Sequence, residues 1–388
     1  MSFISNITNR IFDLQDFRKR QLVFNEYRDH FRNRLVMHEW DPEQKVEGEE
    51  KYLSVWQQLC PRIEPYSYRF FSRYSGKNPY ILPEDLGRTY IEYYLNPLRY
   101  RSFYSDKNLY EQYISPKELF PKVYYRRIMG GKILDTRFHL VKQLDYAMSS
   151  SEFARMMPVD RVVLKRTNDS GGGHDVQCIE RKEDGLFYSN RGMVIDGEFL
   201  QKFAPDWNIQ EVINQHPFFA QFSKTSLNSM RIFTYRSVVD EAVYLYSAIV
   251  RIGHEGSFVD NLTQGGGFVK IDIETGKLVG KVFDEEGYIY DSINGVDFSK
   301  EYVIPQWKEI KDTAMSIARQ IRHCHLVALD LCLDDSNTIR MLEHNIGDCS
   351  YWISLFIGDQ VFGDRIQEVI DYCVEQKKHD PRFRYINK

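Results

Sequence analysis

The chain has 388 residues, of which 43% are hydrophobic and 27% are charged, and its formal net charge is −4. This composition is typical of a globular protein, and the charge excludes a global basic field of the kind that binds nucleic acid. The length predicts two or three packed units. No apolar run of about 18 residues and no secretory segment are found, so we expect a cytoplasmic protein, with peripheral attachment to the inner face of the membrane as an alternative.

The N-terminal third predicts helices. In residues 5–38 apolar side chains recur at helical spacing. The basic residues of this segment either meet anionic lipid or a phosphorylated partner, or form the solvated face of a packed helix. Residues 62–125 are rich in Tyr and Phe and contain the breakers NPY, LPED and NPL, which predict short helices joined by turns. These aromatic side chains either line a carbohydrate site or fill a core.

The rest of the chain mixes strands and helices. Residues 161–181 predict a strand, a glycine loop and a second strand, and residues 242–253 predict another strand. Apolar alternation predicts a hairpin over 268–284 and strand structure in the segment EEGYIYDSI. Residues 305–324 and 364–378 predict amphipathic helices. Antiparallel strands combined with helices indicate α+β lobes rather than a doubly wound sheet.

Six cysteines occur in the chain, and no two have C-x-x-C spacing. The histidines add no pattern that is typical of a zinc site. We therefore predict reduced, mostly buried thiols. They are Cys60, Cys178, Cys324, Cys332, Cys349 and Cys373.

A predicted hairpin near the C-terminus carries two acids and an amide. A turn at 334–337 gives a register in which Asp330 lies opposite Met341. Because side chains alternate along a strand, Asp330, Glu343 and Asn345 then share one face. Two carboxylates and an amide oxygen suit Mg²⁺ that also bridges nucleotide phosphates. The alternative is a polar sheet edge with unrelated acids, and a register slip of one residue would move Asp330 to the other face.

Three further segments carry candidate site residues. Lys165 ends an apolar strand and precedes a triple-glycine turn, whose backbone N–H groups can approach an anion. Arg231 follows Asn228 in the segment SLNSMRIFTYRS, and its guanidinium could hold a phosphate or a carboxylate through two hydrogen bonds. Asn261 stands before a second triple glycine, residues 265–267. Taken alone, each segment also fits a plain loop.

The ordered set of these segments resembles the ATP-grasp superfamily, and in particular its sugar-transfer-associated branch from bacterial polysaccharide loci. The set consists of the lysine strand with its glycine loop, followed in order by IQEVINQHP, SLNSMRIFTYRS, VDNLTQGGGFVKID, ALDLCL and MLEHN. The resemblance covers roughly residues 126–350. It implies an ATP-grasp fold in which two α+β lobes clasp ATP, preceded by a mainly helical N-terminal region.

The resemblance also implies roles for individual residues. Lys165 would contact the phosphates, and Arg231 would steady the transferred phosphoryl group, with Asn261 ordering that end of the site. One or two Mg²⁺ ions, or Mn²⁺ in their place, would bind Asp330, Glu343 and Asn345. The other residues implied to bind the nucleotide are Ser170, Gly171, Gly172, Gly173, Gln210, Glu211, Ile213 and Asn228. A second nucleotide-binding lysine is usual in the family, and the sequence leaves Lys132 and Lys142 as alternatives.

From this resemblance we expect an ATP-dependent carboxylate–amine ligase that works through an acyl phosphate. Its partners would be ATP, a carboxylate substrate such as a uronic acid or its glycan, and an amine such as an amino acid, in capsular or exopolysaccharide biosynthesis. The alternatives are a sugar or polyol kinase and a non-catalytic nucleotide-binding subunit of a glycan assembly complex. The expected organisation is an N-terminal region 1–125, a small lobe 126–215 and a large lobe 216–388.

Overall fold

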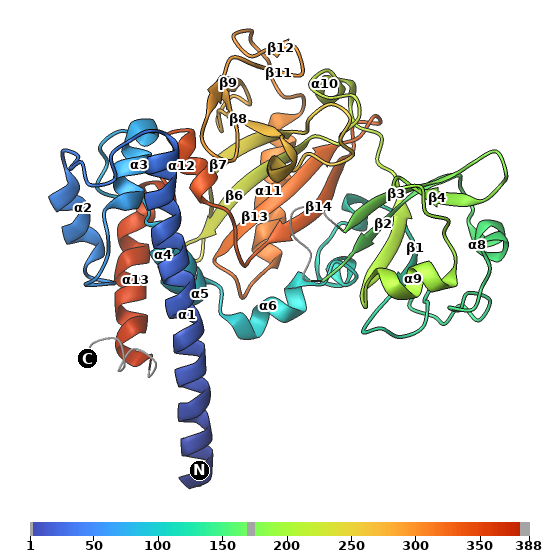
Figure 1. Cartoon of the computed structure of the whole chain (residues 1–388), viewed down its shortest axis with the longest axis horizontal. Coiled ribbons are helices and arrows are strands. Elements are labelled where there is room, and N and C mark those ends of the chain that lie inside the picture. Colours follow the sequence, from blue (N-terminus) through green and yellow to red (C-terminus); the bar gives the residue numbers. More distant parts are fainter. Residues whose placement is uncertain (1–2, 169–174, 381–388) are drawn as a thin grey trace.

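The computed structural model describes residues 3–168 and 175–380. Two antiparallel sheets lie side by side, and helices flank both of them (Figure 1). This arrangement confirms the predicted α+β class. Among the described residues, no helix combines the length and apolar character that crossing a bilayer requires. The predicted state of the cysteines is also confirmed, since all six are buried and none forms a disulfide.

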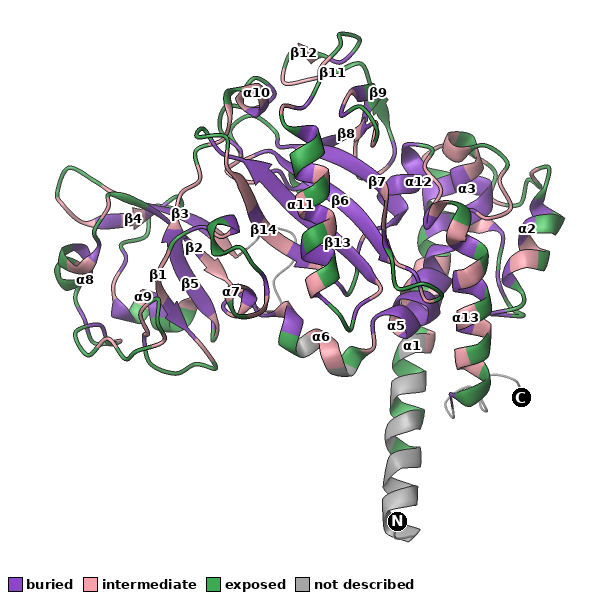
Figure 2. Cartoon of the chain, turned by 180° about the vertical axis from the view of Figure 1, so that it is seen from behind, coloured by how far each residue is buried: buried purple, intermediate pink, exposed green. Residues whose placement is uncertain are grey.

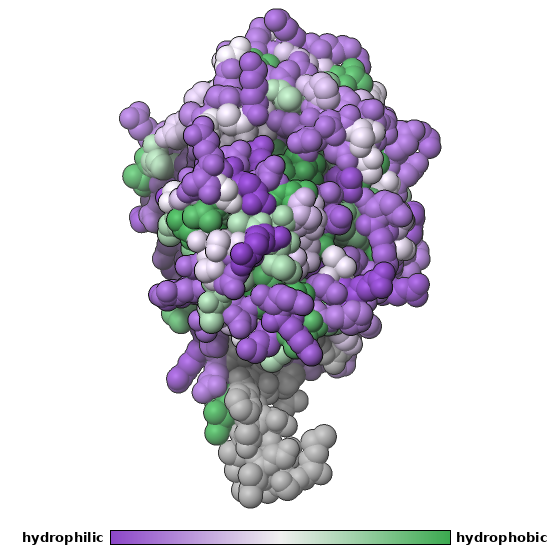
Figure 3. All heavy atoms as spheres, turned by 90° about the vertical axis from the view of Figure 1, so that its right-hand side faces the viewer, coloured by the Kyte–Doolittle hydropathy of each residue, from purple (hydrophilic) through white to green (hydrophobic). Residues whose placement is uncertain are grey.

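The smaller sheet has five strands in the order β1-β5-β2-β3-β4. Their bounds are β1 (Val123–Arg127), β5 (Trp207–Glu211), β2 (Arg161–Arg166), β3 (Val176–Arg181) and β4 (Phe187–Ser189). Two short helices, α8 (Ser150–Met156) and α9 (Gly197–Phe203), begin at side-chain caps, Ser149 with Glu152 for α8 and Asp196 for α9. Both helices contribute to the core of this lobe. The outer face on this side of the molecule is mostly hydrophilic, with separate apolar spots (Figure 3).

The larger sheet has seven strands in the order β10-β9-β8-β7-β6-β13-β14. Their bounds are β10 (Ile289–Tyr290), β9 (Leu278–Phe283), β8 (Gly267–Ile271), β7 (Val243–Ile252), β6 (Ser229–Arg236), β13 (Leu326–Leu333) and β14 (Ile339–Asn345). A separate pair, β11 (Ser292–Ile293) and β12 (Val296–Asp297), follows β10, and a short helix, α10 (Pro217–Ala220), precedes β6. Helix α11 (Trp307–Gln320) packs its apolar stripe on one face of the sheet, where Ile310, Ala314 and Ile317 are buried.

The opposite face of the larger sheet is covered by helices from both ends of the chain. One core joins strand residues such as Phe233 and Phe268 to the N-terminal helices and to the C-terminal helices (Figure 2). These helices are α1 (Phe3–Met37), α2 (Glu49–Trp56), α3 (Tyr66–Ser75), α4 (Glu84–Leu86), a π-helical turn (Gly87–Ile91), α5 (Glu92–Leu95), α12 (Trp352–Phe356) and α13 (Ile366–His379). Many aromatic side chains of residues 62–125 therefore fill a core, as one of the two interpretations predicts.

The chain passes from the N-terminal helices to the smaller sheet through α6 (Leu98–Ser105) and α7 (Tyr110–Tyr113), as Figure 2 shows. Single 3₁₀ turns complete the described structure at Lys117–Leu119, Leu262–Gln264 and Gly363–Arg365. The segment between α6 and α7 lies against the smaller sheet, because the Lys107 N–H donates to the Thr167 carbonyl at 3.0 Å. This contact places Lys107 between the two sheets.

The predicted register of the β13–β14 hairpin is wrong by two residues at the site. Asp330 pairs with Glu343 rather than with Met341, because the turn shifts the register by one residue and a β-bulge between Asp330 and Leu331 shifts it by another. Two shifts preserve the alternation of side chains. Asp330 and Glu343 therefore lie directly opposite each other on one face, and Asn345, two residues along, lies on the same face.

Candidate active site

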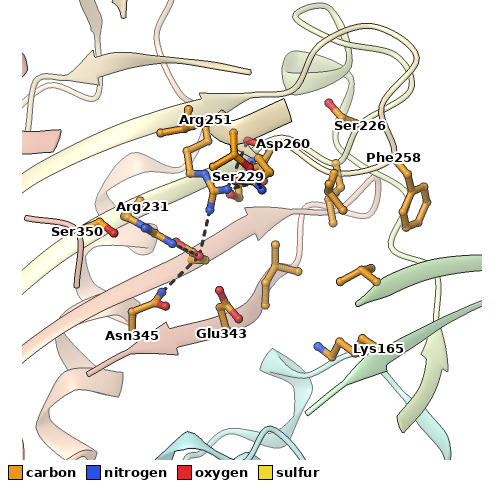
Figure 4. A pocket seen from close by; sticks show the side chains of 18 of the residues that line it. Lys165, Ser226, Ser229, Arg231, Arg251, Phe258, Asp260, Glu343, Asn345 and Ser350 are labelled. Carbon is orange, nitrogen blue, oxygen red and sulfur yellow. Dashed lines mark hydrogen bonds and ion pairs between the residues drawn. The ribbon is translucent and has the colours of Figure 1, made fainter. Parts of the chain in front are cut away.

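A cavity of about 950 Å³ opens between the two sheets. Strands β2 and β5 of the smaller sheet form one wall, and β6, β7, β13 and β14 of the larger sheet form the other. At the far end the cavity reaches helix α1 and the turn that begins at residue 347. Lys165 and Glu343 face this space from opposite sheets (Figure 4).

Alternating acids and arginines form a network on the larger sheet. Arg231 donates to both oxygens of Asp330, from Nε and Nη2 at 2.7 Å each. Arg251 bridges Asp330 and Asp260, with nitrogen–oxygen distances of 3.3 Å to each (Figure 4). Asp260 also accepts a hydrogen bond from the Ser229 N–H at 2.9 Å. Because the arginines neutralise the acids, these charges can remain in a buried position.

Lys107 and Glu343 form a second charged pair at the cavity wall. The Nζ atom of Lys107 lies 2.9 Å from Oε2 of Glu343. Burial alone would raise the pKa of Glu343, but the positive charges of Lys107, Arg231 and Lys165 lower it well below its usual range. Burial and the nearby charge of Lys107 lower the pKa of Lys165 to about 8. Two lysines and a carboxylate that is ionised near neutral pH therefore meet between the sheets.

A buried arginine ties the segment around Lys107 to the smaller sheet. Arg126 of β1 is 1% exposed, and it donates to the Asn108 carbonyl and to the Glu111 carboxylate at 2.8 and 2.7 Å. The Asn108 amide in turn donates to the Arg127 carbonyl and to the Thr167 hydroxyl. Because these contacts come from β1 and the end of β2, Lys107 is held beside Lys165.

Most of the residues singled out in the sequence lie at the cavity. Those that line it are Lys165, Gln210, Glu211, Ile213, Arg231, Asn261, Asp330, Glu343 and Asn345. Ser170, Gly171, Gly172 and Gly173 fall outside the described residues. Lys132 and Lys142 are exposed and do not line the cavity. Among the described residues, Lys107 and Lys224 line the cavity together with Lys165, and Lys107 is the one that pairs with Glu343.

Glu211 lines the cavity, but its carboxylate is engaged elsewhere. Oε1 of Glu211 accepts a hydrogen bond from the Lys122 N–H at 2.9 Å and lies 3.7 Å from Nη1 of Arg340. The cavity wall continues through Val212 and Ile213. The Glu211 carboxylate is therefore engaged by protein groups.

Asn228 holds the scaffold together and does not line the cavity. It is 1% exposed, and its amide nitrogen donates to the Phe219 carbonyl at 2.9 Å and to Oε1 of Gln215 at 3.1 Å. Its amide oxygen accepts from Ser226 Oγ and from the Gly253 N–H. These bonds clamp the segment before β6 onto the end of β7.

Replacement of Asn228 by alanine is therefore expected to act on stability. Loss of several buried hydrogen bonds should lower the free energy of unfolding by about 2–4 kcal/mol, measured by urea denaturation. The affinity of the folded variant for nucleotide should stay within about twofold of the wild type. A large loss of nucleotide affinity without a loss of stability would instead place Asn228 at the ligand.

The second triple glycine serves chain packing. Gly265 has a φ of +83°, which favours glycine, and a Cβ on Gly266 would lie 2.8 Å from the Asn261 carbonyl oxygen. None of the glycines at 265–267 lines the cavity. The loop thus folds tightly onto itself, and this fold presents Asn261, whose side chain donates to Thr263 Oγ1 at 2.6 Å.

Comparison with known protein families identifies the family to which the chain belongs. A model of the family described as sugar-transfer associated ATP-grasp matches residues 89–369, which is more than half of the chain. The chain belongs to this family. The predicted ATP-grasp fold is thereby confirmed, and the two sheets with the cavity between them are its two lobes. No curated protein matches the chain.

Several solved structures are similar to this chain at low sequence identity. Biotin carboxylase from Campylobacter jejuni is 11% identical with a TM-score of 0.40, and the match covers 72% of this chain and 48% of that one. D-alanyl-alanine synthetase A from Vibrio cholerae is 13% identical, with a TM-score of 0.38 and coverages of 71% and 65%. D-alanine–D-alanine ligase from Bacillus anthracis is 10% identical, with a TM-score of 0.36 and coverages of 74% and 72%. The chain thus spans about half the length of the carboxylase.

ATP-grasp proteins use ATP, typically with Mg²⁺, and the donor set fits such an ion. Among residues 3–168 and 175–380, no three His, Cys, Asp or Glu side chains gather as a metal site. Asp330 and Glu343 instead provide two carboxylates, and Asn345 provides an amide that lies 3.5 Å from Asp330. Mg²⁺ is commonly held by one or two carboxylates plus phosphate oxygens and water, so this small set is appropriate.

Proposed function

We propose that the chain is an ATP-dependent carboxylate–amine ligase that joins an amino acid to a uronic-acid sugar in capsular or exopolysaccharide biosynthesis. One observation carries the proposal. A single cavity runs from the lysines, past the acids and arginines, to helix α1, so it offers space for further substrates beside a nucleotide. Membership of the sugar-transfer associated family supports the choice of a sugar substrate.

The proposed chemistry has two steps. A carboxylate oxygen of the sugar attacks the γ-phosphorus of ATP, the bond to the β-phosphate oxygen breaks, and ADP leaves. The amine then attacks the acyl carbon of the resulting acyl phosphate, phosphate leaves, and the amine nitrogen gives up a proton. Lys107 and Lys165 would hold ATP phosphates, and Arg231 and Arg251 would stabilise the charge that develops on the transferred group. Mg²⁺ bound by Asp330, Glu343 and Asn345 would neutralise phosphate charge.

We also propose a division of the chain into an N-terminal region 1–125, a small lobe 126–215 and a large lobe 216–388. In this division ATP lies between the small and large lobes. The segment 210–213 would hold adenine and ribose, and the loop at 170–173 would close over the phosphates. The N-terminal region shares its core with the larger sheet. We propose that this region supports the end of the cavity beside helix α1, where the further substrates would bind.

A substrate screen separates the proposed ligase from its alternatives. Purified protein is given ATP, Mg²⁺, glucuronic or galacturonic acid, and pools of amino acids, and the products are identified by mass spectrometry. Formation of ADP, phosphate and an amide that requires both substrates supports the ligase. A phosphorylated sugar would indicate a kinase, and ATP binding without ADP formation would indicate a non-catalytic subunit.

The lowered pKa of Lys165 predicts proton uptake when nucleotide binds. Burial and, to a smaller extent, the charge of Lys107 lower this pKa to about 8, while Glu343 and Cys332 oppose the shift. At pH 8 about half of the Lys165 amines in the free protein are therefore neutral. Phosphate oxygens favour the charged form and raise the pKa. Calorimetry in buffers of different ionisation enthalpy at pH 8.5 should therefore detect proton uptake on ATP binding. Lys165→Met should abolish most of it, and an unchanged uptake in this variant would contradict the assignment.

A further inference from the structure

Helix α1 contributes a buried arginine to the far end of the cavity. Arg34 is 5% exposed and lines the cavity, as do His30 and Glu26 of the same helix. This helix lies outside the segment that matches the family, residues 89–369. The N-terminal region therefore forms part of the same cavity as the lysines and acids of the two lobes.

The guanidinium of Arg34 is poorly satisfied. Within residues 3–168 and 175–380 it donates no hydrogen bond, and its buried Nε atom has no hydrogen-bond partner. One ion pair, Nε to Oε2 of Glu286 at 3.2 Å, partly balances its charge, and Glu286 is 43% exposed. The rings of Phe31, Trp352 and Phe356 surround it, with centroids 5.6–5.9 Å from its central carbon. A buried guanidinium that donates no hydrogen bond to the described residues and has a single, partly exposed acid as its ion-pair partner points to an anionic ligand.

The other charged side chains at this end of the cavity differ in whether they have a protein partner. Arg88 is engaged by Glu84, at 2.8 Å, and by Asp348. Glu285, by contrast, lines the cavity and has no hydrogen bond or ion pair to the described residues. Burial, together with the charges of Arg34 and Arg88, lowers the pKa of His30 to about 4, so His30 is neutral near pH 7. Among the described residues at this end of the cavity, Glu285 and Glu26 therefore keep carboxylates without a hydrogen bond or ion pair, and of the two Glu285 is the less exposed and lies next to Glu286, the partner of Arg34.

We infer that Arg34 binds the carboxylate of an amino-acid co-substrate, with Glu285 facing its ammonium group. The inference rests on the proposed ligase and names the amine that this ligase uses. A guanidinium holds a carboxylate through two parallel hydrogen bonds. The ligand carboxylate would thus supply hydrogen-bond acceptors that the described part of the protein does not offer to Arg34. The amine end of the bound amino acid then remains within the same cavity as Arg231 and Asp330.

The test measures binding directly, so that it does not depend on turnover. Pools of the twenty amino acids are screened against the full chain, with ATP analogue and Mg²⁺, by saturation-transfer NMR. Each amino acid that binds is then titrated beside its decarboxylated amine. We expect binding of at least one amino acid, about ten- to a hundredfold weaker binding of the matching amine, and the same loss for the amino acid with Arg34→Met.

Three further variants test whether the lost contact with the carboxylate causes the lower affinity of Arg34→Met. Arg34→Lys keeps the charge without the two-pronged geometry and should recover only part of the affinity. Glu286→Gln removes the partner of Arg34 and should leave binding unchanged or about two- to fivefold tighter. Arg32→Met makes the same change on the same helix at a half-exposed arginine that does not line the cavity, and it should have no effect.

Several results would overturn the inference. These are the absence of any amino acid that binds, equal binding of the decarboxylated amine, unchanged affinity in Arg34→Met, and equal losses in Arg34→Met and Glu286→Gln. Failure of the ligase itself is recognised separately, because the substrate screen would then give no amide. An amide product made with equal efficiency by wild type and Arg34→Met would keep the proposed function and remove the role of Arg34.

Discussion

Replacement of Glu343 by glutamine is expected to lower ADP formation by about a hundred- to a thousandfold while leaving the fold intact. The amide cannot neutralise Lys107, which lies 2.9 Å from the carboxylate, and it is a weaker ligand for Mg²⁺. The side chain of Glu343 is 28% exposed, so the free energy of unfolding should change by only about 1 kcal/mol. Initial rates of ADP release, with circular dichroism and urea denaturation, measure both effects.

A matched control is available on the surface. Glu274 pairs with Lys311 at 3.4 Å, is 78% exposed and does not line the cavity. Glu274→Gln therefore removes a comparable lysine partner without touching the site, and its turnover should equal that of the wild type. If Glu343→Gln retained near-normal turnover, the placement of the metal and of the reacting phosphate beside β14 would be wrong.

Replacement of Asp330 by asparagine is expected to damage both stability and activity. Its carboxylate is 3% exposed and is the shared partner of Arg231 and Arg251. Asparagine leaves two buried guanidinium groups without this charge, which should lower the free energy of unfolding by about 3–5 kcal/mol. Turnover should fall by at least about a hundredfold, because Asp330 is also one of the two carboxylates that we propose hold Mg²⁺.

A double-mutant cycle identifies the source of the lost stability. Arg231→Met removes one of the two stranded cations, so the double variant with Asp330→Asn should be less destabilised than the sum of the single changes. The interaction energy between the two positions should be about 1–3 kcal/mol, measured by urea denaturation. Additive losses would show that the Arg231–Asp330 pair does not determine the stability of the network.

The sequence predicted the positions of the candidate site residues correctly where the alternation of side chains along a single strand determines their direction. Lys165 ends an apolar strand, and Glu343 and Asn345 alternate on β14, so their common direction follows from strand geometry. The position of Asp330 was predicted through a wrong register. It remained on the shared face because the turn and the β-bulge shift the pairing by one residue each. No sequence pattern signals such a bulge, since it depends on packing between strands.

Other site residues depend on contacts between distant segments. Lys107 stands in a polar turn with no motif, and contacts from Thr167 and Arg126 place it at the cavity. Arg251 had a detectable signal, because it is the single charged residue of the apolar strand β7. Arg34 had none, since basic residues are common along α1 and its burial results from packing against α12.

Transfer of labelled oxygen reports whether the proposed enzyme activates a carboxylate as an acyl phosphate. The uronic acid that supports turnover is labelled with ¹⁸O in its carboxylate and incubated with ATP, Mg²⁺, the amino acid and the protein. We expect one ¹⁸O atom in each inorganic phosphate released, since the carboxylate oxygen attacks the γ-phosphorus and leaves with phosphate when the amide forms. Phosphate free of ¹⁸O, or label retained in a phosphorylated sugar, would contradict it.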